Sequence, residues 1–255
     1  MQKKTKESPK QQDGLSLKNK HLTIHKELYR QRTCFNARFF LYLCRIFTRT
    51  IVIMTKANKV LFITQEITPY VSESEMANIG RHLPQAIQEK GREIRTFMPK
   101  WGNINERRNQ LHEVIRLSGM NLIIDDTDHP LIIKVASIQS ARMQVYFIDN
   151  DDYFQNRLQT ADENGVEYDD NDSRAIFYAR GVLETVKKLR WCPDVIHCHG
   201  WMTALAPLYI KKAYKDEPSF RDAKVVFSVY EDDFKGTFNN DFASKLMLKG
   251  INKKM

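Results

Sequence analysis

Cysteine is scarce in this chain, and its cysteines form no recognisable motif. Cys34, Cys44, Cys192 and Cys198 are the four present, and no two of them make a Cys-x-x-Cys pair. Small disulfide-stabilised domains need many closely spaced cysteines, so a disulfide framework is not indicated. We therefore expect a reducing compartment and a cytoplasmic location.

Long apolar runs are also lacking. The apolar segment 35–53 is interrupted by Arg38, Arg45 and Arg49, so its longest uncharged run is residues 39–44. A helix needs about 20 consecutive apolar residues to cross a bilayer, so we expect no membrane span. A small-residue cleavage site is missing as well, which argues against a signal peptide. A helix lying on a membrane surface stays open as an alternative for this segment.

Positive charge is confined to one end of the chain. Residues 1–53 contain 12 Lys/Arg and 3 Asp/Glu, which accounts for the whole formal charge of +9, whereas the other 28 Lys/Arg and 28 Asp/Glu cancel. The folded part therefore lacks the basic excess of a nucleic-acid-binding domain, and we expect no nucleic-acid partner. We interpret residues 1–53 as a basic extension, either a disordered tail or an upstream over-extension of the reading frame, with Met54 as the natural start.

The rest of the chain has the pattern of a parallel α/β domain. Apolar residues at spacings of three and four predict a helix between the first two strands, and two more helices follow later. This strand–helix–strand order predicts a Rossmann-like doubly wound sheet. The predicted strands are residues 60–63, 93–98, 194–198 and 224–229, and the predicted helices are residues 76–90, 175–189 and 201–214.

Single residues refine the helix predictions. Pro84 lies inside the first helix and predicts a kink or break near His82, because proline removes a hydrogen bond and clashes with the preceding turn. Gly91 is a suitable residue to end that helix. Asp172 or Ser173 is placed to cap the second helix.

Three further segments have a different character. Residues 111–149 contain short apolar runs separated by turn residues, which predicts hairpins. Residues 150–172 are rich in acidic residues and predict a surface loop. Residues 241–255 form a lysine-rich tail, which we expect to be solvated.

Three blocks of this sequence resemble, in order, the motifs of bacterial glycogen synthases and plant starch synthases. The family pattern S-E-x-x-P-x-x-K-T-G-G-L-A-D-V-x-x-x-L-P aligns with residues 65–84. The pattern D-V-[IV]-H-x-H-D-W-x-x-[AG]-L-x-P aligns with residues 194–207, and F-T-[VI]-H-N-x-x-Y-Q-G-x-F aligns with residues 227–238. The resemblance implies that residues 54–240 are the N-terminal, acceptor-side domain of a two-domain GT-B glycosyltransferase. The family moves glucose from ADP-glucose to an α-1,4-glucan with retention of configuration.

The sequence departs from these motifs where the resemblance places the family's chemistry. Residues 72–75 read Ser-Glu-Ser-Glu in place of the lysine and glycines beside the donor phosphates, so carboxylates would repel a diphosphate and side chains would block close backbone approach. An aspartate of the second block is replaced by Gly200, and a His-Asn pair of the third by Tyr230-Glu231. The crevice candidates by motif position are Glu66, Ser72, Glu73, Ser74, Glu75, His199, Gly200, Trp201, Tyr230 and Glu231.

His197 and His199 alternate along a predicted strand and could share a face, as a metal-binding pair would. No third ligand has suitable spacing, and the resembling family uses this segment without metal, so we predict neither a metal site nor a cofactor. We expect His197 to pack in the core and His199 to line the crevice at the carboxyl ends of the strands. Trp201 is the indole best placed there to stack on a sugar ring.

Three functions stay open, and we assign no catalytic residue. The first is a glycogen or starch synthase-like protein that is non-catalytic as a lone chain and acts as a binding or regulatory module for an α-glucan or a small ligand. The second is the acceptor-side half of an active glycosyltransferase that a separate donor-domain protein completes. The third is an unrelated small-ligand-binding function on the same fold. Because the family's donor domain would follow residue 255, the sequence leaves open whether the chain is an enzyme.

Overall fold

The computed structural model describes residues 58–231 and 238–251. The basic extension and its alternative as a membrane-surface helix lie outside the described residues. Within the described residues, no helix combines the length and apolarity that a membrane crossing requires.

The strands are β1 (Lys59–Thr64), β2 (Glu93–Pro99), β3 (His112–Glu113), β4 (Met120–Ile124), β5 (Thr127–Ile138), β6 (Met143–Asp149), β7 (Val195–His199) and β8 (Lys224–Ser228). The helices are α2 (Glu75–Glu89), α3 (Asn171–Lys188), α4 (Leu205–Lys212) and α5 (Phe242–Lys245), with 3-10 turns η1 (Gln139–Ala141) and η2 (Trp201–Thr203).

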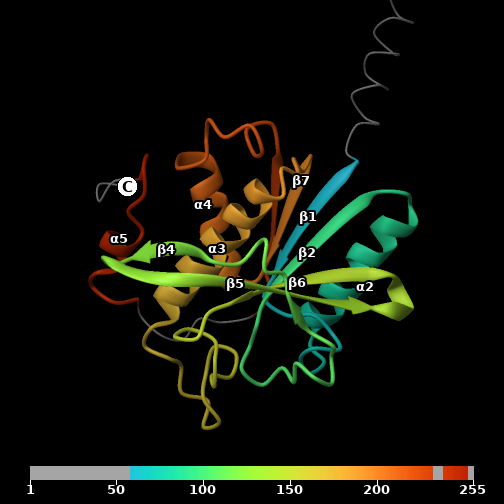
Figure 1. Cartoon of the computed structure of the whole chain (residues 1–255), viewed down its shortest axis with the longest axis horizontal. Helices are drawn as coiled ribbons and strands as arrows, with labels where there is room; N and C mark the ends of the chain where they lie inside the picture. The colour runs from blue at the N-terminus through green and yellow to red at the C-terminus, as the bar shows by residue number, and fades with distance from the viewer. Residues whose placement is uncertain (1–57, 232–237, 252–255) are drawn as a thin grey trace, which may run out of the picture. The chain divides into compact units, whose positions relative to one another are not determined.

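The strands form one mixed sheet in the order β3-β5-β6-β2-β1-β7-β8, and β4 pairs with β5. β6, β2, β1, β7 and β8 are parallel neighbours, and the order of connection reverses between β1 and β7. Figure 1 shows α3 and α4 together on one side of these strands and α2 on the other. The predicted Rossmann-like doubly wound fold is therefore confirmed. In such sheets, ligands bind at the carboxyl ends of the strands where the order reverses.

The segment between β2 and α3 contains the predicted hairpins. β4, β5 and β6 are consecutive antiparallel partners. Asp125 and Asp126 form the two-residue turn between β4 and β5, with φ angles of 51° and 59°. A tight hairpin turn with positive φ at both central residues matches the right-handed twist of its strands, and aspartate tolerates this conformation better than most residues. The following loop, residues 150–170, lies between β6 and α3 as predicted.

The first helix, α2, begins and ends one residue earlier than predicted, and it is continuous. α2 continues through Pro84, so the predicted break near His82 is wrong. Proline costs the helix one hydrogen bond, but Pro84 is buried in the packing of α2, which keeps the helix continuous. Gly91 terminates the helix as predicted, because it has a φ of 78° and its N–H donates to the Gln88 carbonyl over 2.8 Å.

The other two helices also differ from their predictions. α3 begins at Asn171, four residues before the predicted start, and the Asp170 side chain at the cap position makes no capping hydrogen bond. Neither Asp172 nor Ser173 caps the helix, because both lie inside its first turn, where the Asp172 carboxylate accepts hydrogen bonds from Ser173. The predicted helix over residues 201–214 is divided into η2 and α4.

Part of the C-terminal segment is packed against the domain, so the prediction of a solvated tail is wrong for Lys245, whereas Lys249 is exposed. The Lys245 side chain is only 10% exposed and pairs with Asp172 and Asp241, with Nζ–O distances of 3.3 and 3.2 Å. Ile251 is buried, and Gly250 lies so close to α4 that an added Cβ would be 2.8 Å from a backbone oxygen. The apolar side chains that bring the segment onto the core are Phe242, Leu246 and Leu248.

We predict that Lys245→Ala destabilises the chain by about 3 kcal/mol in urea denaturation, because it leaves the Asp172 carboxylate buried without its cation. Lys249→Ala is the matched control, since Lys249 is an exposed lysine of the same segment. Equal stability losses in the two variants would show that the Asp172 pair does not hold this segment.

Candidate functional site

The loop that follows β1 is closed by hydrogen bonds of its own side chains. Ser74 caps α2: its hydroxyl oxygen accepts a hydrogen bond from the Ala77 N–H over 2.9 Å and its O–H donates to the Glu66 carboxylate. Gly80 of α2 lies against the same loop, where an added Cβ would be 2.5 Å from the Glu66 carbonyl oxygen. The free N–H groups of a helix N-terminus attract anions, and here the serine side chain occupies one of them.

The charge at this helix end is also unsuited to an anion. Glu66, Glu73 and Glu75 place three carboxylates around the N-terminus of α2, and the last two are exposed. Carboxylates at this end interact favourably with the helix dipole, and they repel a phosphate that would occupy the same place. In this structure, residues 72–75, which stand in place of the family's lysine and glycines, therefore form the capped start of α2.

At the carboxyl end of β7, an aspartate in place of Gly200 would need a strained backbone and a shift of two neighbouring side chains. Gly200 has φ 82° and ψ 160°, a backbone conformation that is essentially restricted to glycine. An added Cβ would be 2.8 Å from the Met76 sulfur and 2.9 Å from Gln65 Oε1. Gln65 Oε1 in turn accepts a hydrogen bond from the Met202 N–H over 3.3 Å. Met76 and Gln65 thus fill the space beside Gly200, and the motif comparison did not single out either residue.

The two histidine rings of β7 are in contact, with centroids 4.0 Å apart and an angle of 33° between their planes. His199 is fully buried, and its Nδ1 lies 2.7 Å from the Tyr230 hydroxyl oxygen. His197 keeps partial exposure, and its Nε2 lies 2.8 Å from Ser228 Oγ. Their exposure is thus the reverse of the expectation, because Tyr230, which stands where the family has histidine, contacts the His199 ring.

Burial and the neighbouring His197 lower the pKa of His199 to about 3. Burial also lowers the pKa of His197. Both imidazoles are therefore neutral at pH 7 and offer no positive charge to an anionic ligand. The partly exposed Trp201 begins η2 directly after this strand end.

The lysines at the carboxyl edge of the sheet are neutralised by nearby carboxylates. Lys100 follows β2 and lies 3.0 Å from Glu106. Lys134 on β5 bridges Glu106 at 2.6 Å and Asp149 at 2.8 Å. Two cations and two anions form one network, so neither lysine is available as an unpaired cation for a diphosphate.

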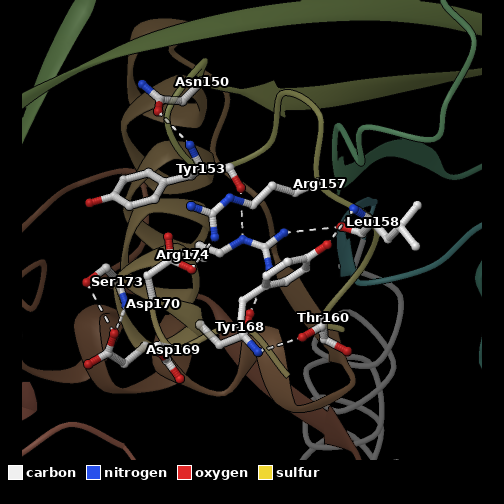
Figure 2. Close-up of polar contacts among 12 residues, drawn as sticks. Asn150, Tyr153, Arg157, Leu158, Thr160, Tyr168, Asp169, Asp170, Ser173 and Arg174 are labelled. Carbon is white, nitrogen blue, oxygen red and sulfur yellow. Dashed lines mark hydrogen bonds and ion pairs between the residues drawn. The ribbon is translucent and has the colours of Figure 1, made fainter. Parts of the chain in front are cut away.

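The loop between β6 and α3 is organised around a buried arginine (Figure 2). The Arg174 guanidinium donates to the carbonyl oxygens of Tyr153, Leu158 and Gln159 over 2.8, 3.3 and 2.7 Å, and to Asn171 Oδ1 over 2.7 Å. The rings of Trp101, Phe154 and Tyr168 lie 5.0–5.5 Å from its central carbon. A buried charge is tolerated when it is hydrogen-bonded in this way, and aromatic faces add attraction.

A pocket of about 430 Å³ opens in this loop. Arg157 is part of its lining, where it pairs with Asp170 at 2.7 Å and lies over the Tyr168 ring at 5.1 Å. The sequence interpretation described this region only as an acidic surface loop. No signal for the pocket was available in the sequence, because Arg174 precedes the predicted helix at residues 175–189 and its burial is a property of the structure. The lining residues are Arg157, Asp162, Val166, Glu167, Tyr168, Asp169 and Asp170.

The structure brings together only some of the candidates. Glu66 contacts Ser74, and His199 contacts Tyr230. Ser72, Glu73, Glu75 and Glu231 are exposed. In the part of the chain that is described, no three His, Cys, Asp or Glu side chains are grouped as a metal ion would need.

We predict that Gly200→Ala destabilises the chain by about 2 kcal/mol or more, since it combines backbone strain with contact to Met76. Gly165→Ala is the control, because Gly165 also has a positive φ of 77° but no atom within 4 Å of an added Cβ. Thermal and urea unfolding measure both variants. A Gly200 variant no less stable than the Gly165 variant would contradict the crowding described here.

A second prediction concerns acid stability. Burial would raise the pKa of Glu106, but hydrogen bonds from Lys134 and Lys100 outweigh it, and the pKa is lowered. A lowered pKa stabilises the folded state above the unfolded-state pKa of about 4.3, and this contribution is lost as pH falls through the folded-state value. Glu106→Gln should therefore cost about 1 kcal/mol at pH 7, because the group is partly screened by solvent.

That loss should begin to shrink below about pH 4.3, where the carboxyl group of the unfolded chain takes up a proton, and it should vanish once the pH falls below the lowered pKa of the folded-state carboxyl group. Urea denaturation across pH 3–7 measures the difference, and Glu163→Gln in an exposed part of the acidic loop is the control. A difference between wild type and the Glu106 variant that is the same at every pH would disprove the assignment.

Comparison with known proteins agrees with the motif blocks. The family model described as "Starch synthase catalytic domain" matches residues 59–255. The glycogen synthase of Pelodictyon phaeoclathratiforme (strain DSM 5477 / BU-1) is 41% identical over 179 residues, which cover 69% of this chain and 37% of that protein. The glycogen synthase of Chlorobium limicola (strain DSM 245 / NBRC 103803 / 6330) is 41% identical over 173 residues, covering 68% of this chain and 35% of that protein.

A solved structure, the catalytic domain of Starch Synthase IV from Arabidopsis thaliana bound to ADP and acarbose, has a similar fold. Its TM-score is 0.58 at 20% identity, over 68% of this chain and 34% of that one. The chain thus spans just over a third of the length of the curated relatives it matches. With a family match over residues 59–255 on this fold, the chain belongs to the starch synthase catalytic domain family.

Proposed function

We propose that this chain is a glucan-binding or regulatory module of the glycogen and starch synthase family that does not transfer glucose by itself. The observation that carries the proposal is the arrangement of side chains at the carboxyl ends of β1 and β7. There, Ser74 caps α2, three carboxylates surround the helix end, and Met76 and Gln65 fill the space beside Gly200.

These features act against a nucleotide sugar more than against a neutral saccharide. A diphosphate needs cations or free N–H groups, and Lys100 and Lys134 are already paired with carboxylates. The buried, neutral His199 adds no positive charge. The related Starch Synthase IV domain is bound to ADP and acarbose, and of these two kinds of ligand we propose that this chain keeps the saccharide.

Trp201 is the side chain that we propose for saccharide contact at this edge. It is partly exposed, and it lies at the start of η2 directly after β7. Aromatic side chains combine a large apolar face with low conformational freedom, which suits stacking against a sugar ring.

We predict that the purified chain transfers no labelled glucose from ADP-glucose to glycogen, yet sediments with glycogen in the same samples. Trp201→Ala should reduce the sedimented fraction severalfold. Ile115→Ala is the control, because it truncates an apolar side chain that is 84% exposed and lies on a different loop. Glucose incorporation by the chain alone would contradict the non-catalytic assignment, and failure to sediment would contradict glucan binding.

A second candidate function follows from the exposed edge of the sheet. Val226, Phe227 and Val229 on or next to β8 are 45%, 38% and 84% exposed, and within the described residues β8 pairs only with β7. An apolar edge strand is a common docking surface for another polypeptide. A separate donor-domain chain could complete an active enzyme here, and incorporation that requires an added donor domain from a relative would support this candidate.

A further inference from the structure

The two ends of the sheet differ in how they are protected against further strand pairing. In the described part of the chain, the order of strands ends at β3 on one side and at β8 on the other. β3 is only two residues long, and His112 and Glu113 are both exposed. Short edge strands and charged side chains keep an edge from pairing with another chain. β8 is longer, and the run from Val225 to Val229 contains no charge, so the β8 edge lacks this protection.

The side chains of β8 are apolar and exposed on both faces of the sheet. Consecutive strand residues face opposite sides, and Val226 and Phe227 are 45% and 38% exposed. Parallel strands of α/β sheets are normally covered on both faces. Of the eight large apolar side chains that are exposed in the described residues, three lie within residues 226–229, which marks this strand as an interaction surface.

The pairing of β8 with β7 determines which backbone groups of β8 face the edge. The Lys224 N–H donates to the Asp194 carbonyl oxygen over 3.0 Å, on the β7 side. Alternate residues of an extended strand direct their N–H and C=O groups to the same side. The backbone groups of Val225, Phe227 and Val229 therefore point away from β7, and they are spaced symmetrically about Phe227.

This symmetry makes the edge complementary to itself. In an antiparallel arrangement with Phe227 of one copy opposite Phe227 of the other, Val225 lies opposite Val229, and the edge-facing N–H and C=O groups of each pair match. Side chains on opposite strands also pair suitably, because Phe227 meets Phe227, Val225 meets Val229 and Val226 meets Ser228. Aromatic and β-branched cross-strand pairs of this kind stabilise sheets.

The charges at the ends of this segment favour the antiparallel direction. Lys224 lies at one end and Glu231 at the other, and both are exposed. Antiparallel pairing brings the Lys224 end of each copy beside the Glu231 end of its partner, whereas parallel pairing would bring like charges together. Lys224 then lies opposite the Tyr230 ring, so no charged side chain is directly opposite one of the same sign.

We propose that two copies of this chain dimerise through β8, antiparallel and centred on Phe227, so that one sheet continues through both copies. The proposal goes beyond glucan binding and does not rest on it, because no saccharide takes part in the pairing. A donor domain docked at β8 would need the same edge-facing backbone groups, so the two occupants exclude each other.

Analytical ultracentrifugation of the full chain, from about 1 to 100 µM, tests the proposal, because dimerisation depends on protein concentration. Phe227→Lys and Phe227→Glu each place two like charges opposite one another at the centre of the pairing. We expect each variant alone to dimerise at least tenfold more weakly than the wild type and an equal mixture of the two to recover the dimer. Ile115→Lys is the matched control, since it changes an exposed apolar side chain far from β8 in sequence and should leave dimerisation unchanged.

Hydrogen exchange of the wild-type chain keeps the test independent of variant stability. Exchange at the amides of Val225, Phe227 and Val229 should slow as the protein concentration rises. The amides of Lys224 and Val226 face β7, so their exchange should depend little on concentration.

A wild-type chain that stays monomeric over the whole range, or a dimer that Phe227→Lys leaves intact, would overturn the proposal. A mixture no more dimeric than the separate variants would overturn the register centred on Phe227. A complex that forms only with an added donor domain would assign the β8 edge to that partner and overturn self-pairing. Glycogen sedimentation is measured separately, so either proposal can fail while the other stands.

Discussion

The parallel pairing of β1 with β7 is the constraint on which the arrangement at the strand ends depends. Their register places Thr64 opposite His199, so the residues that follow, Gln65 and Gly200, leave the sheet side by side. Five of the six residues of β1 are buried, and a one-residue slip would turn each of its side chains to the opposite face. Because the register is fixed in this way, the first and second motif blocks meet at one point.

At these strand ends, the protein's own side chains cap the helix and fill the space beside the strands. The Ser74 hydroxyl satisfies the helix end, and the Gln65 and Met76 side chains occupy the volume beside Gly200. Two of the substituted residues have hydrogen-bond partners there: Ser74 contacts Glu66, and Tyr230 contacts His199. These two replaced residues thus form hydrogen bonds with residues that the chain shares with the family motifs.

The order of strands and helices could be predicted because it follows from patterns within short segments. Buried parallel strands are short continuous apolar runs, and tight turns have characteristic residues, so the sheet and the β4–β5 hairpin were accessible from the sequence. What could not be predicted depends on contacts between distant segments. Asp172 pairs with Lys245, 73 residues away, and no local pattern distinguishes that carboxylate from a helix cap.

For the candidate site, the positions of the strand ends could be predicted from the sequence, but the burial of the side chains could not. Motif spacing located the two strand ends correctly, since the residues that follow a strand lie at its carboxyl edge whatever the packing. The burial of His199 depends on Tyr230, 31 residues further along the chain, and the continuity of α2 through Pro84 depends on tertiary packing. Both required the three-dimensional arrangement, because side-chain burial is a property of the neighbours as much as of the residue.

The hydrogen bonds of Arg174 have a consequence for how the loop pocket can change. Three of its four partners are backbone carbonyl oxygens, which every residue type provides. The path of the loop is therefore fixed by one arginine, largely independent of the side chains that the loop carries. Substitutions at its exposed positions could alter the pocket's recognition chemistry while preserving its shape, so the loop has the properties of a scaffold on which binding preference can diverge or be redesigned.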